Sequence, residues 1–361
     1  MIVDDLVRTL IAFVRQSGGP KRNEGNSMKK ILSAFSVGCF ALTAAQAALA
    51  DDHLEEITVA YFLEWPLPMM EAKANETYAK ELGLKVNWFS FETGTAMSAA
   101  MAAGDVQIAV SQGIPPFVVA ASAGQDLQVV DVAVTYSEND NCVVAARHEI
   151  DKTNASELAG KRVAVPLGTA AHYGFLRQMD HFGVDLSSLE IVDMAPPEGA
   201  AALSQGAVDF ACGYGGGLTR MKEHGNVLLT GAEKEELGIL VFDVISSPAA
   251  FVAENPDIVA KFIEVTAAAN SRWTSGEGGD EMLTVVAKEA GMDLDAARAA
   301  ISTMGFPSID EQLTPKWMEG GIQTFMKGVA EVFVSAGSID SAKDNYEDNV
   351  TAEPMKIANG G

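Results

Sequence analysis

The order of apolar and small-residue segments occurs twice along this chain, and this repeat constrains the fold more than any other feature. Short apolar runs predict strands over 57–63, 85–91, 106–110, 162–166, 189–194 and 208–212. Segments with helical spacing or small residues, bounded by glycine, predict helices over 70–82, 96–103, 170–182 and 199–204. Each copy predicts a β-loop-α-β-loop-α-β unit, which requires parallel strands covered by helices. Two copies predict two similar α/β lobes.

The later part of the chain has a different pattern. After Phe242, amphipathic segments predict helices over 256–272, 282–290, 294–304 and 317–336. We expect this helical part to pack on the first lobe, and the chain to cross between lobes near 136–142 and 240–247. The predicted fold is α/β with two lobes, each a mainly parallel sheet flanked by helices, on a two-segment hinge. The predicted divisions are 51–138 for the first part of lobe 1, 139–243 for lobe 2 and 244–361 for the part that completes lobe 1.

Residues 28–50 have the pattern of an export signal. A basic start, Met28-Lys29-Lys30, precedes an apolar run over 31–45, and the small residues of Ala48-Leu49-Ala50 follow. The apolar run is short for a membrane span, and acidic residues come directly after the signal. Residues 1–27 are interpreted as an upstream extension. We therefore expect export to the periplasm.

The charge of the chain restricts its partners. The formal net charge is −24, so phosphates would be repelled, and nucleic acid is excluded as an expected partner. Acidity favours a cationic or zwitterionic small ligand, although a charged surface can also serve solubility alone. Cys142 and Cys212 could pair in an oxidising compartment or stay as buried thiols. The sequence has no metal-type spacing of cysteine or histidine, and we expect no metal and no cofactor.

Ligands of parallel α/β sheets bind beyond the carboxyl ends of the strands, so the loops there contain the candidate residues. Hydroxyl and amide side chains at helix starts suit an anion, because the first backbone N–H groups of a helix are free. Aromatic faces and a carboxylate suit a cation. The candidate ligand-binding residues are Tyr61, Glu64, Trp65, Thr93, Thr95, Ser111, Gln112, Thr169, His172, Tyr173 and Tyr214.

Several of these residues have a structural alternative. Trp65 could fill the base of the first lobe, and Glu64 could be a solvated loop acid. The threonines could simply cap helices. His172 is more typical of a structural hydrogen-bonding group than of a ligand contact, since it lies at a helix start.

Three motifs carry a resemblance to a known family. They are GKRVAVPLGTAAHY (160–173), AAGDVQIAVSQGIPP (102–116) and LSQGAVDFACGYGGG (203–217). With the lobe layout, they make residues 55–345 resemble the substrate-binding proteins of taurine, sulfonate and nitrate ABC importers. The resemblance implies a two-lobed periplasmic binding protein without catalysis, closure around one small solute and delivery to an inner-membrane ABC permease. We expect a monomer.

Departures from the family pattern bear on the ligand. Only Thr169 remains of a hydroxyl-rich run before His172, and Tyr214 stands where relatives tend to have a tryptophan. The loop at Glu64-Trp65 is both acidic and aromatic. These changes favour a small zwitterion, either taurine-like or a betaine or sulfonium osmolyte. The alternatives are a thiamine-precursor pyrimidine stacked between Trp65 and Tyr214, or an enzyme on this fold that uses His172.

Overall fold

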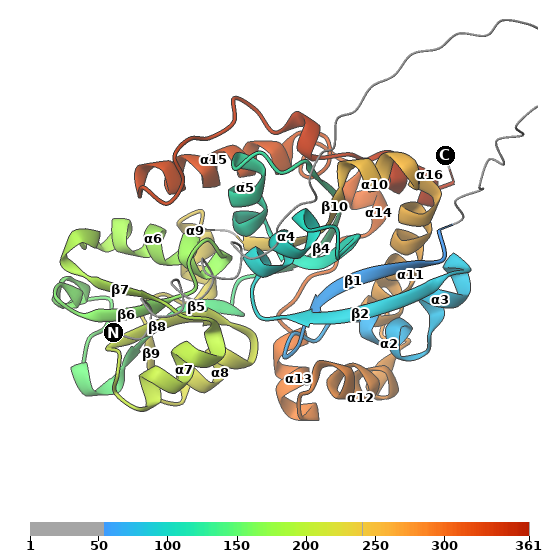
Figure 1. Ribbon diagram of the computed structural model, residues 1–361. Helices are drawn as coiled ribbons and strands as arrows, with labels where there is room; N and C mark the ends of the chain where they lie inside the picture. The colour runs from blue at the N-terminus through green and yellow to red at the C-terminus, as the bar shows by residue number, and fades with distance from the viewer. Residues whose placement is uncertain (1–53, 240, 361) are drawn as a thin grey trace, which may run out of the picture. The chain divides into compact units, whose positions relative to one another are not determined.

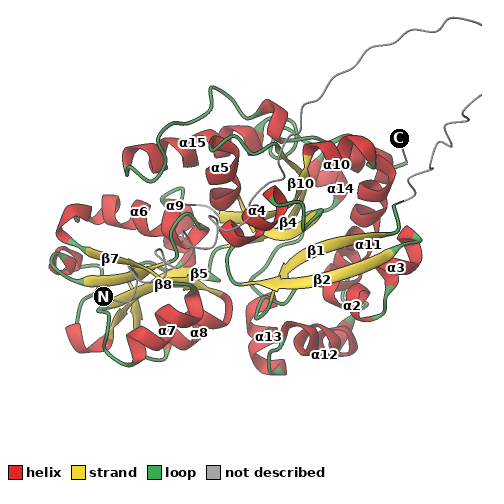
Figure 2. Ribbon diagram, in the orientation of Figure 1, coloured by secondary structure: helices red, strands yellow, loops and turns green. Residues whose placement is uncertain are grey.

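The computed structural model describes residues 54–239 and 241–360, which form two α/β lobes (Figures 1 and 2). Each lobe is built on one mixed sheet with helices packed against it, so the predicted fold class is confirmed. The predicted export signal and upstream extension lie outside the described residues. No helix among those that the structure describes is both long enough and apolar enough to span a bilayer.

The sheet of the first lobe has the strand order β2-β1-β3-β10-β4. Its strands are β1 (Glu56–Phe62), β2 (Lys85–Phe91), β3 (Ile108–Gly113), β4 (Leu127–Tyr136) and β10 (Val241–Pro248). β1 pairs in parallel with β2 and β3, whereas β10 runs antiparallel to both β3 and β4. Val59 and Ile108 lie fully buried at the centre of this sheet, because β1 and β3 are covered on both faces.

The sheet of the second lobe repeats this arrangement in the order β7-β6-β8-β5-β9. Its strands are β5 (Asp140–Ala145), β6 (Arg162–Val165), β7 (Glu190–Asp193), β8 (Phe210–Tyr214) and β9 (Gly225–Val227). β6 is parallel to β7 and β8, and β5 is antiparallel to β8. Cys142 of β5 and Cys212 of β8 lie directly opposite each other and form a disulfide, with 3.9 Å between their Cα atoms.

Helices connect the strands and cover the sheets. In the first lobe these are α2 (Met69–Ala74), α3 (Thr77–Leu82), α4 (Gly94–Ala102) and α5 (Ile114–Ser122). In the second they are α6 (Ala170–Phe182), α7 (Pro196–Ser204), α8 (Gly215–Lys222) and α9 (Gly231–Glu236). The C-terminal part contributes α10 (Ala249–Glu254), α11 (Pro256–Thr274), α12 (Gly279–Ala290), α13 (Leu294–Ile301), α14 (Ile309–Gln312), α15 (Gly321–Ser335) and α16 (Glu353–Ala358).

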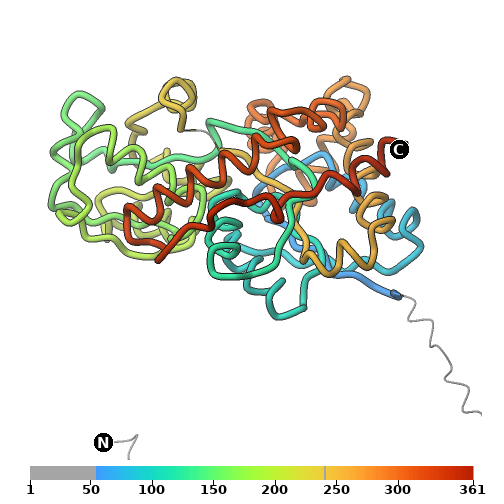
Figure 3. The backbone as a smooth tube through the Cα atoms, turned by 90° about the horizontal axis from the view of Figure 1, so that it is seen from above, coloured from blue at the N-terminus to red at the C-terminus, as the bar shows by residue number. Residues whose placement is uncertain are grey.

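The C-terminal helices pack mainly on the first lobe, but one of them joins both lobes. α11 contacts α2 and α3, and α16 contacts β4. α15 packs against α5 of the first lobe and α6 of the second. In the view from above in Figure 3, α15 extends over both lobes. The ring of His172 on α6 stacks on Phe333 of α15, with 5.3 Å between ring centroids.

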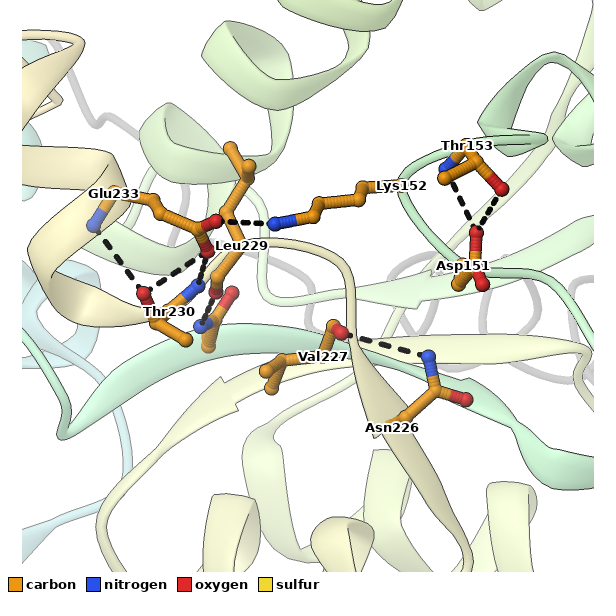
Figure 4. A network of polar contacts seen from close by, with 9 residues as sticks. Asp151, Lys152, Thr153, Asn226, Val227, Leu229, Thr230 and Glu233 are labelled. Atoms are coloured by element: carbon orange, nitrogen blue, oxygen red, sulfur yellow. Dashed lines mark hydrogen bonds and ion pairs between the residues drawn. The ribbon is translucent and has the colours of Figure 1, made fainter.

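Two segments carry the chain between the sheets. The outward segment lies between Tyr136, the last residue of β4, and Asp140, the first residue of β5. The return follows α9, which begins with a capping box in which Thr230 and Glu233 exchange hydrogen bonds. Lys152 donates to Glu233 across 2.6 Å and ties this helix start to a neighbouring loop (Figure 4).

Several predictions differ from the structure, including the three that follow. The helix predicted over 70–82 is two helices, because Glu76 adopts a left-handed conformation (φ 55°) between them. The strand predicted over 106–110 is Ile108–Gly113, so Ser111 and Gln112 belong to the strand. β10 begins at Val241 in the first sheet, whereas the sequence assigned 241–243 to the second lobe.

Candidate functional site

Residues of both lobes enclose a small chamber beyond the strand ends. The chamber has a volume of about 20 Å³, space for roughly one water molecule. Its walls come from β1, β3, β4 and β10, from the starts of α4 and α6, and from the end of β8. The lining residues are Phe62, Trp65, Gly94, Ser111, Gly113, Pro116, Tyr136, Thr169, Ala170, Tyr214 and Asp243.

A buried carboxylate, Asp243, is the charged group of the chamber. Its Oδ2 accepts a hydrogen bond from Ser111 Oγ at 2.6 Å, and its Oδ1 accepts one from Tyr136 Oη at 2.7 Å. Burial raises the pKa of Asp243 to about 7; the two hydrogen bonds oppose this shift, and nearby Asp140 adds to it. No positively charged side chain is among the residues described as lining the chamber.

Aromatic rings form the other walls. The ring of Trp65 meets that of Tyr136 edge to face, with 4.9 Å between centroids, and its Nε1 donates to Ser111 Oγ at 2.8 Å. Tyr214 lines the chamber from the second lobe. The centroid of its ring lies 6.5 Å from that of Trp65, and the two ring planes meet at 80°. Rings in this arrangement do not form parallel faces, so the stacking of a pyrimidine between Trp65 and Tyr214 has no support in the geometry.

The starts of α4 and α6 reach the chamber from opposite lobes. Thr93 caps α4 by accepting a hydrogen bond from the N–H of Ala96, and Gly94 lines the chamber. Thr169 Oγ1 donates to the carbonyl of Pro166 at 2.6 Å, so α6 receives no hydrogen bond from the side chain at its cap position. Free backbone N–H groups of the first turn of α6 therefore face the seam between the lobes.

Other predicted residues support the site from outside the chamber. Gln112 is fully buried; its Nε2 donates to the Gly94 carbonyl and to Ser98 Oγ, and its Oε1 accepts from Ser246. These bonds hold the first turn of α4 against β3 and β10. Thr95 hydrogen-bonds with Thr93 and lines a cavity of about 480 Å³ whose walls come from both lobes.

His172 and Tyr173 face α15 and do not line the chamber. The Nδ1 of His172 accepts a hydrogen bond from the N–H of Gly168 at 3.1 Å. Burial lowers the pKa of His172 to about 4, so the ring is neutral at pH 7, and nearby Asp193 opposes the shift only in part. The hydroxyl of Tyr173 accepts from Arg177, and its ring packs on Phe325 of α15. A reactive role for His172 has no geometric support.

Tyr61 and Glu64 also lie outside the chamber. The ring of Tyr61 packs edge to face on Trp88, under the ammonium group of Lys73. Glu64 forms an ion pair with Arg220 of the second lobe and lines a cavity of about 470 Å³. This cavity is far larger than the chamber but contains a carboxylate and a guanidinium that already neutralise each other. We therefore place the ligand chemistry in the smaller chamber.

Two polar residues of the chamber, Tyr136 and Asp243, are not among the residues that the sequence predicts, and neither is Arg220 of the outer cavity. Tyr136 ends β4 and Asp243 lies in β10, and both belong to the segments where the chain crosses between the lobes. The single acid within the apolar run VFDVISS was the available signal for Asp243. Arg220 gave no such signal, because an arginine on a helix is usually solvated. Among residues 54–239 and 241–360, no cluster of potential ligands could hold a metal ion.

Comparison with known proteins gives two relatives that are named as binding proteins. Over 206 residues the chain is 32% identical to the taurine-binding periplasmic protein of Escherichia coli K12, covering 57% of this chain and 62% of that protein. It is 24% identical over 245 residues to a putative aliphatic sulfonates-binding protein of Bacillus subtilis, covering 66% of this chain and 72% of that protein. The chain thus spans about three fifths of the length of the first relative.

Solved structures share the fold. The sulfonate-binding protein SsuA of Xanthomonas axonopodis pv. citri, bound to MOPS, matches with a TM-score of 0.65 and 18% identity over 79% of this chain and 94% of that chain. The desulfurization enzyme DszB matches with a TM-score of 0.58 and 12% identity, and the match covers 85% of this chain and 99% of that chain. The family model described as NMT1/THI5 like matches residues 67–274, more than half of the chain. The chain therefore belongs to the NMT1/THI5-like family.

Proposed function

We propose that this protein is a periplasmic solute-binding protein that captures a small zwitterion between its lobes and delivers it to an ABC permease. The observation that carries the proposal is the Asp243 carboxylate, buried in the chamber with hydroxyl donors but without a cation among the lining residues. A buried carboxylate is costly unless a positive charge joins it. A ligand with a cationic group would supply that charge.

The two ends of a zwitterion fit different parts of the chamber. An ammonium or other onium group would lie against Asp243, beside the aromatic rings of Trp65 and Tyr136. A sulfonate or carboxylate would then lie toward the first turns of α4 and α6, where backbone N–H groups favour an anion. Such a ligand is taurine-like or betaine-like, as the sequence predicts, and the relative named for taurine supports the same class.

Closure of the lobes would provide the mechanism. Asp243 and Trp65 belong to the first lobe, and Thr169 and Tyr214 belong to the second. A ligand that contacts both sets binds the closed form better than the open form and so shifts the population toward closure. Because the taurine and sulfonate relatives are named as binding proteins, we propose binding rather than catalysis.

Calorimetric titration with taurine tests the proposal directly, and 2-hydroxyethanesulfonate is the matched ligand because a neutral hydroxyl replaces the ammonium group of taurine. Taurine should bind more tightly, by at least about tenfold, since a charged hydrogen bond is lost in the analogue. Asp243→Asn should remove this preference, while Asp280→Asn, at an exposed surface pair, should keep it. Equal affinity of the wild-type protein for both sulfonates would refute the proposal.

A further inference from the structure

We propose that Glu64 of the first lobe and the start of α8 in the second form a latch that holds the lobes closed without touching the ligand. The inference rests on the proposed function only for the choice of ligand. The latch residues line the outer cavity of about 470 Å³ and are absent from the inner chamber. Glu64 and Arg220 are therefore positioning residues, distinct from the groups that would bind the solute.

The ion pair has two parallel contacts. Arg220 Nη1 donates to Glu64 Oε1 at 2.7 Å, and Arg220 Nη2 donates to Glu64 Oε2 at 3.0 Å. A planar guanidinium that meets both oxygens of a carboxylate is more directional than a single charge contact. Because the two residues belong to different lobes, the pair exists only in a closed arrangement.

The first lobe holds Glu64 ready for this contact. Its backbone adopts a left-handed conformation with φ 54°, which is uncommon for a residue with a side chain. The N–H of Glu64 donates to the carbonyl of Ala290, at the end of α12, at 2.7 Å. Trp65, the next residue, is buried and bonded to Ser111. Neighbours in the first lobe therefore support a conformation that turns the carboxylate toward the second lobe.

The second lobe presents a surface shaped for that carboxylate. The first turn of α8 consists of Gly215, Gly216 and Gly217. A Cβ atom at Gly215 would lie 2.8 Å from the Glu64 carbonyl oxygen, and one at Gly216 would overlap the Glu64 carboxylate. The glycines thus permit the acid to approach the positive end of the helix dipole, where a negative charge is stabilised. Gly215 and Gly216 accommodate this close approach, whereas Gly217 makes room for Pro196.

A second contact across the seam lies next to the latch. The hydroxyl of Tyr214, the residue before α8, donates to the carbonyl of Glu92 in the first lobe at 2.8 Å. Tyr214 lines both the chamber and the outer cavity, as does Trp65. A closed latch therefore keeps Tyr214 against the chamber. When the latch opens, Tyr214 would move away and uncover the ligand.

Dissociation kinetics of taurine in Glu64→Gln, Arg220→Gln and the double variant test the latch. Each single variant should raise the dissociation rate about 3- to 10-fold, since the pair is partly exposed to water. The double variant should lose little more than either single one. Arg162→Gln, which breaks an exposed pair within the second lobe, is the matched control and should leave the rate unchanged. Additive losses, or rates equal to wild type, would overturn the latch.

Gly216→Ala provides a variant that retains both charges. The added methyl group displaces the Glu64 carboxylate, so the dissociation rate should rise as in Glu64→Gln, and adding Gly216→Ala to Glu64→Gln should have little further effect. Alanine is favourable within a helix, so the variant should remain folded.

Small-angle scattering of the ligand-free protein separates the latch from the choice of ligand. If taurine does not bind, the proposed function fails, but Glu64→Gln should still raise the radius of gyration relative to wild type. An unchanged radius would refute the latch.

Discussion

Ser111, a serine in a left-handed conformation, positions the charged group of the candidate site. Its φ of 63° is unusual for a residue with a side chain, and this strain costs free energy of about 1–3 kcal/mol. Two hydrogen bonds offset the cost: Ser111 Oγ donates to Asp243 and accepts from Trp65 Nε1. The bonds link an aromatic wall of the chamber to its carboxylate, so Ser111 acts by orienting other groups.

Taurine affinity should depend on pH because Asp243 must be ionised to bind a cation. Burial raises the pKa of Asp243 to about 7, so below that pH the carboxyl is largely protonated and a cationic ligand must displace the proton. Affinity should fall as pH decreases below 7, by at most about tenfold per pH unit. Titrations between pH 5.5 and 8, in buffers of different ionisation enthalpy, should show proton release at the acid end.

Asp140 and Tyr136 lie near Asp243, so the variants must separate their contributions. Burial raises the pKa of Asp140 to about 6, and Asp140→Asn should therefore leave most of the pH dependence intact. Asp243→Asn should abolish it. An affinity that stays flat across this range in the wild-type protein would contradict a cation-binding role for Asp243.

Asp131 in β4 should reduce the stability of the folded state as pH rises. Burial raises its pKa to about 7, and in the described structure its Oδ1 has no hydrogen-bond partner. The folded state therefore retains this proton between pH 4 and 7 while the unfolded state loses it, so the free energy of unfolding falls across that window. Urea unfolding should give Asp131→Asn a free energy of unfolding close to that of wild type near pH 4.5. At pH 8 the free energy of unfolding of the variant should be higher than that of wild type. A constant difference between the two proteins would contradict this assignment.

At the level of elements, the disulfide between β5 and β8 should stabilise the second lobe. It joins Cys142 and Cys212 across 70 residues of chain, which restricts the unfolded state. Replacing both with alanine should lower the free energy of unfolding by about 2–4 kcal/mol. Urea unfolding of the double variant measures the loss, and wild type treated with reductant under denaturing conditions is the control. A loss of unfolding free energy below about 0.5 kcal/mol would show that the disulfide does not stabilise the second lobe.

The sequence predicts the elements that repeat and misses those that close each sheet. Strands such as β1 and β6 stand out because each is a short apolar run followed by a helix. β10 does not, because it pairs with β3 and β4 although it lies more than a hundred residues later in the chain. This long-range pairing places Asp243 opposite Gly113 and brings Tyr136 beside it. The local pattern marks Asp243 only as a lone acid in an apolar run, and its place in the site depends on this pairing. Trp65, Thr169 and Tyr214 lie in loops and at helix starts that the local pattern predicts.

On the scale of the whole described unit, the chamber is too small in this closed arrangement for a ligand to enter. Its volume of about 20 Å³ accommodates about one water molecule, and Trp65 and Tyr214 line both the chamber and the outer cavity. The walls belong to separate lobes, with only two connecting segments and α15 shared between them. Entry of a solute therefore requires the lobes to part, and this opening precedes binding.

A covalent bond between the lobes should block that opening. Gly168 lies against Thr95 across the seam: a Cβ atom added at position 168 would be 3.1 Å from Thr95 Cγ2. The double variant Thr95→Cys with Gly168→Cys therefore places two thiols within reach of each other. The oxidised ligand-free double variant should bind taurine at least about a hundredfold more slowly than either single variant, because closed lobes admit no solute. The single variants control for the cost of a side chain at the left-handed Gly168 (φ 75°). Equal association rates in cross-linked and single variants would mean that solute reaches the chamber without separation of the lobes.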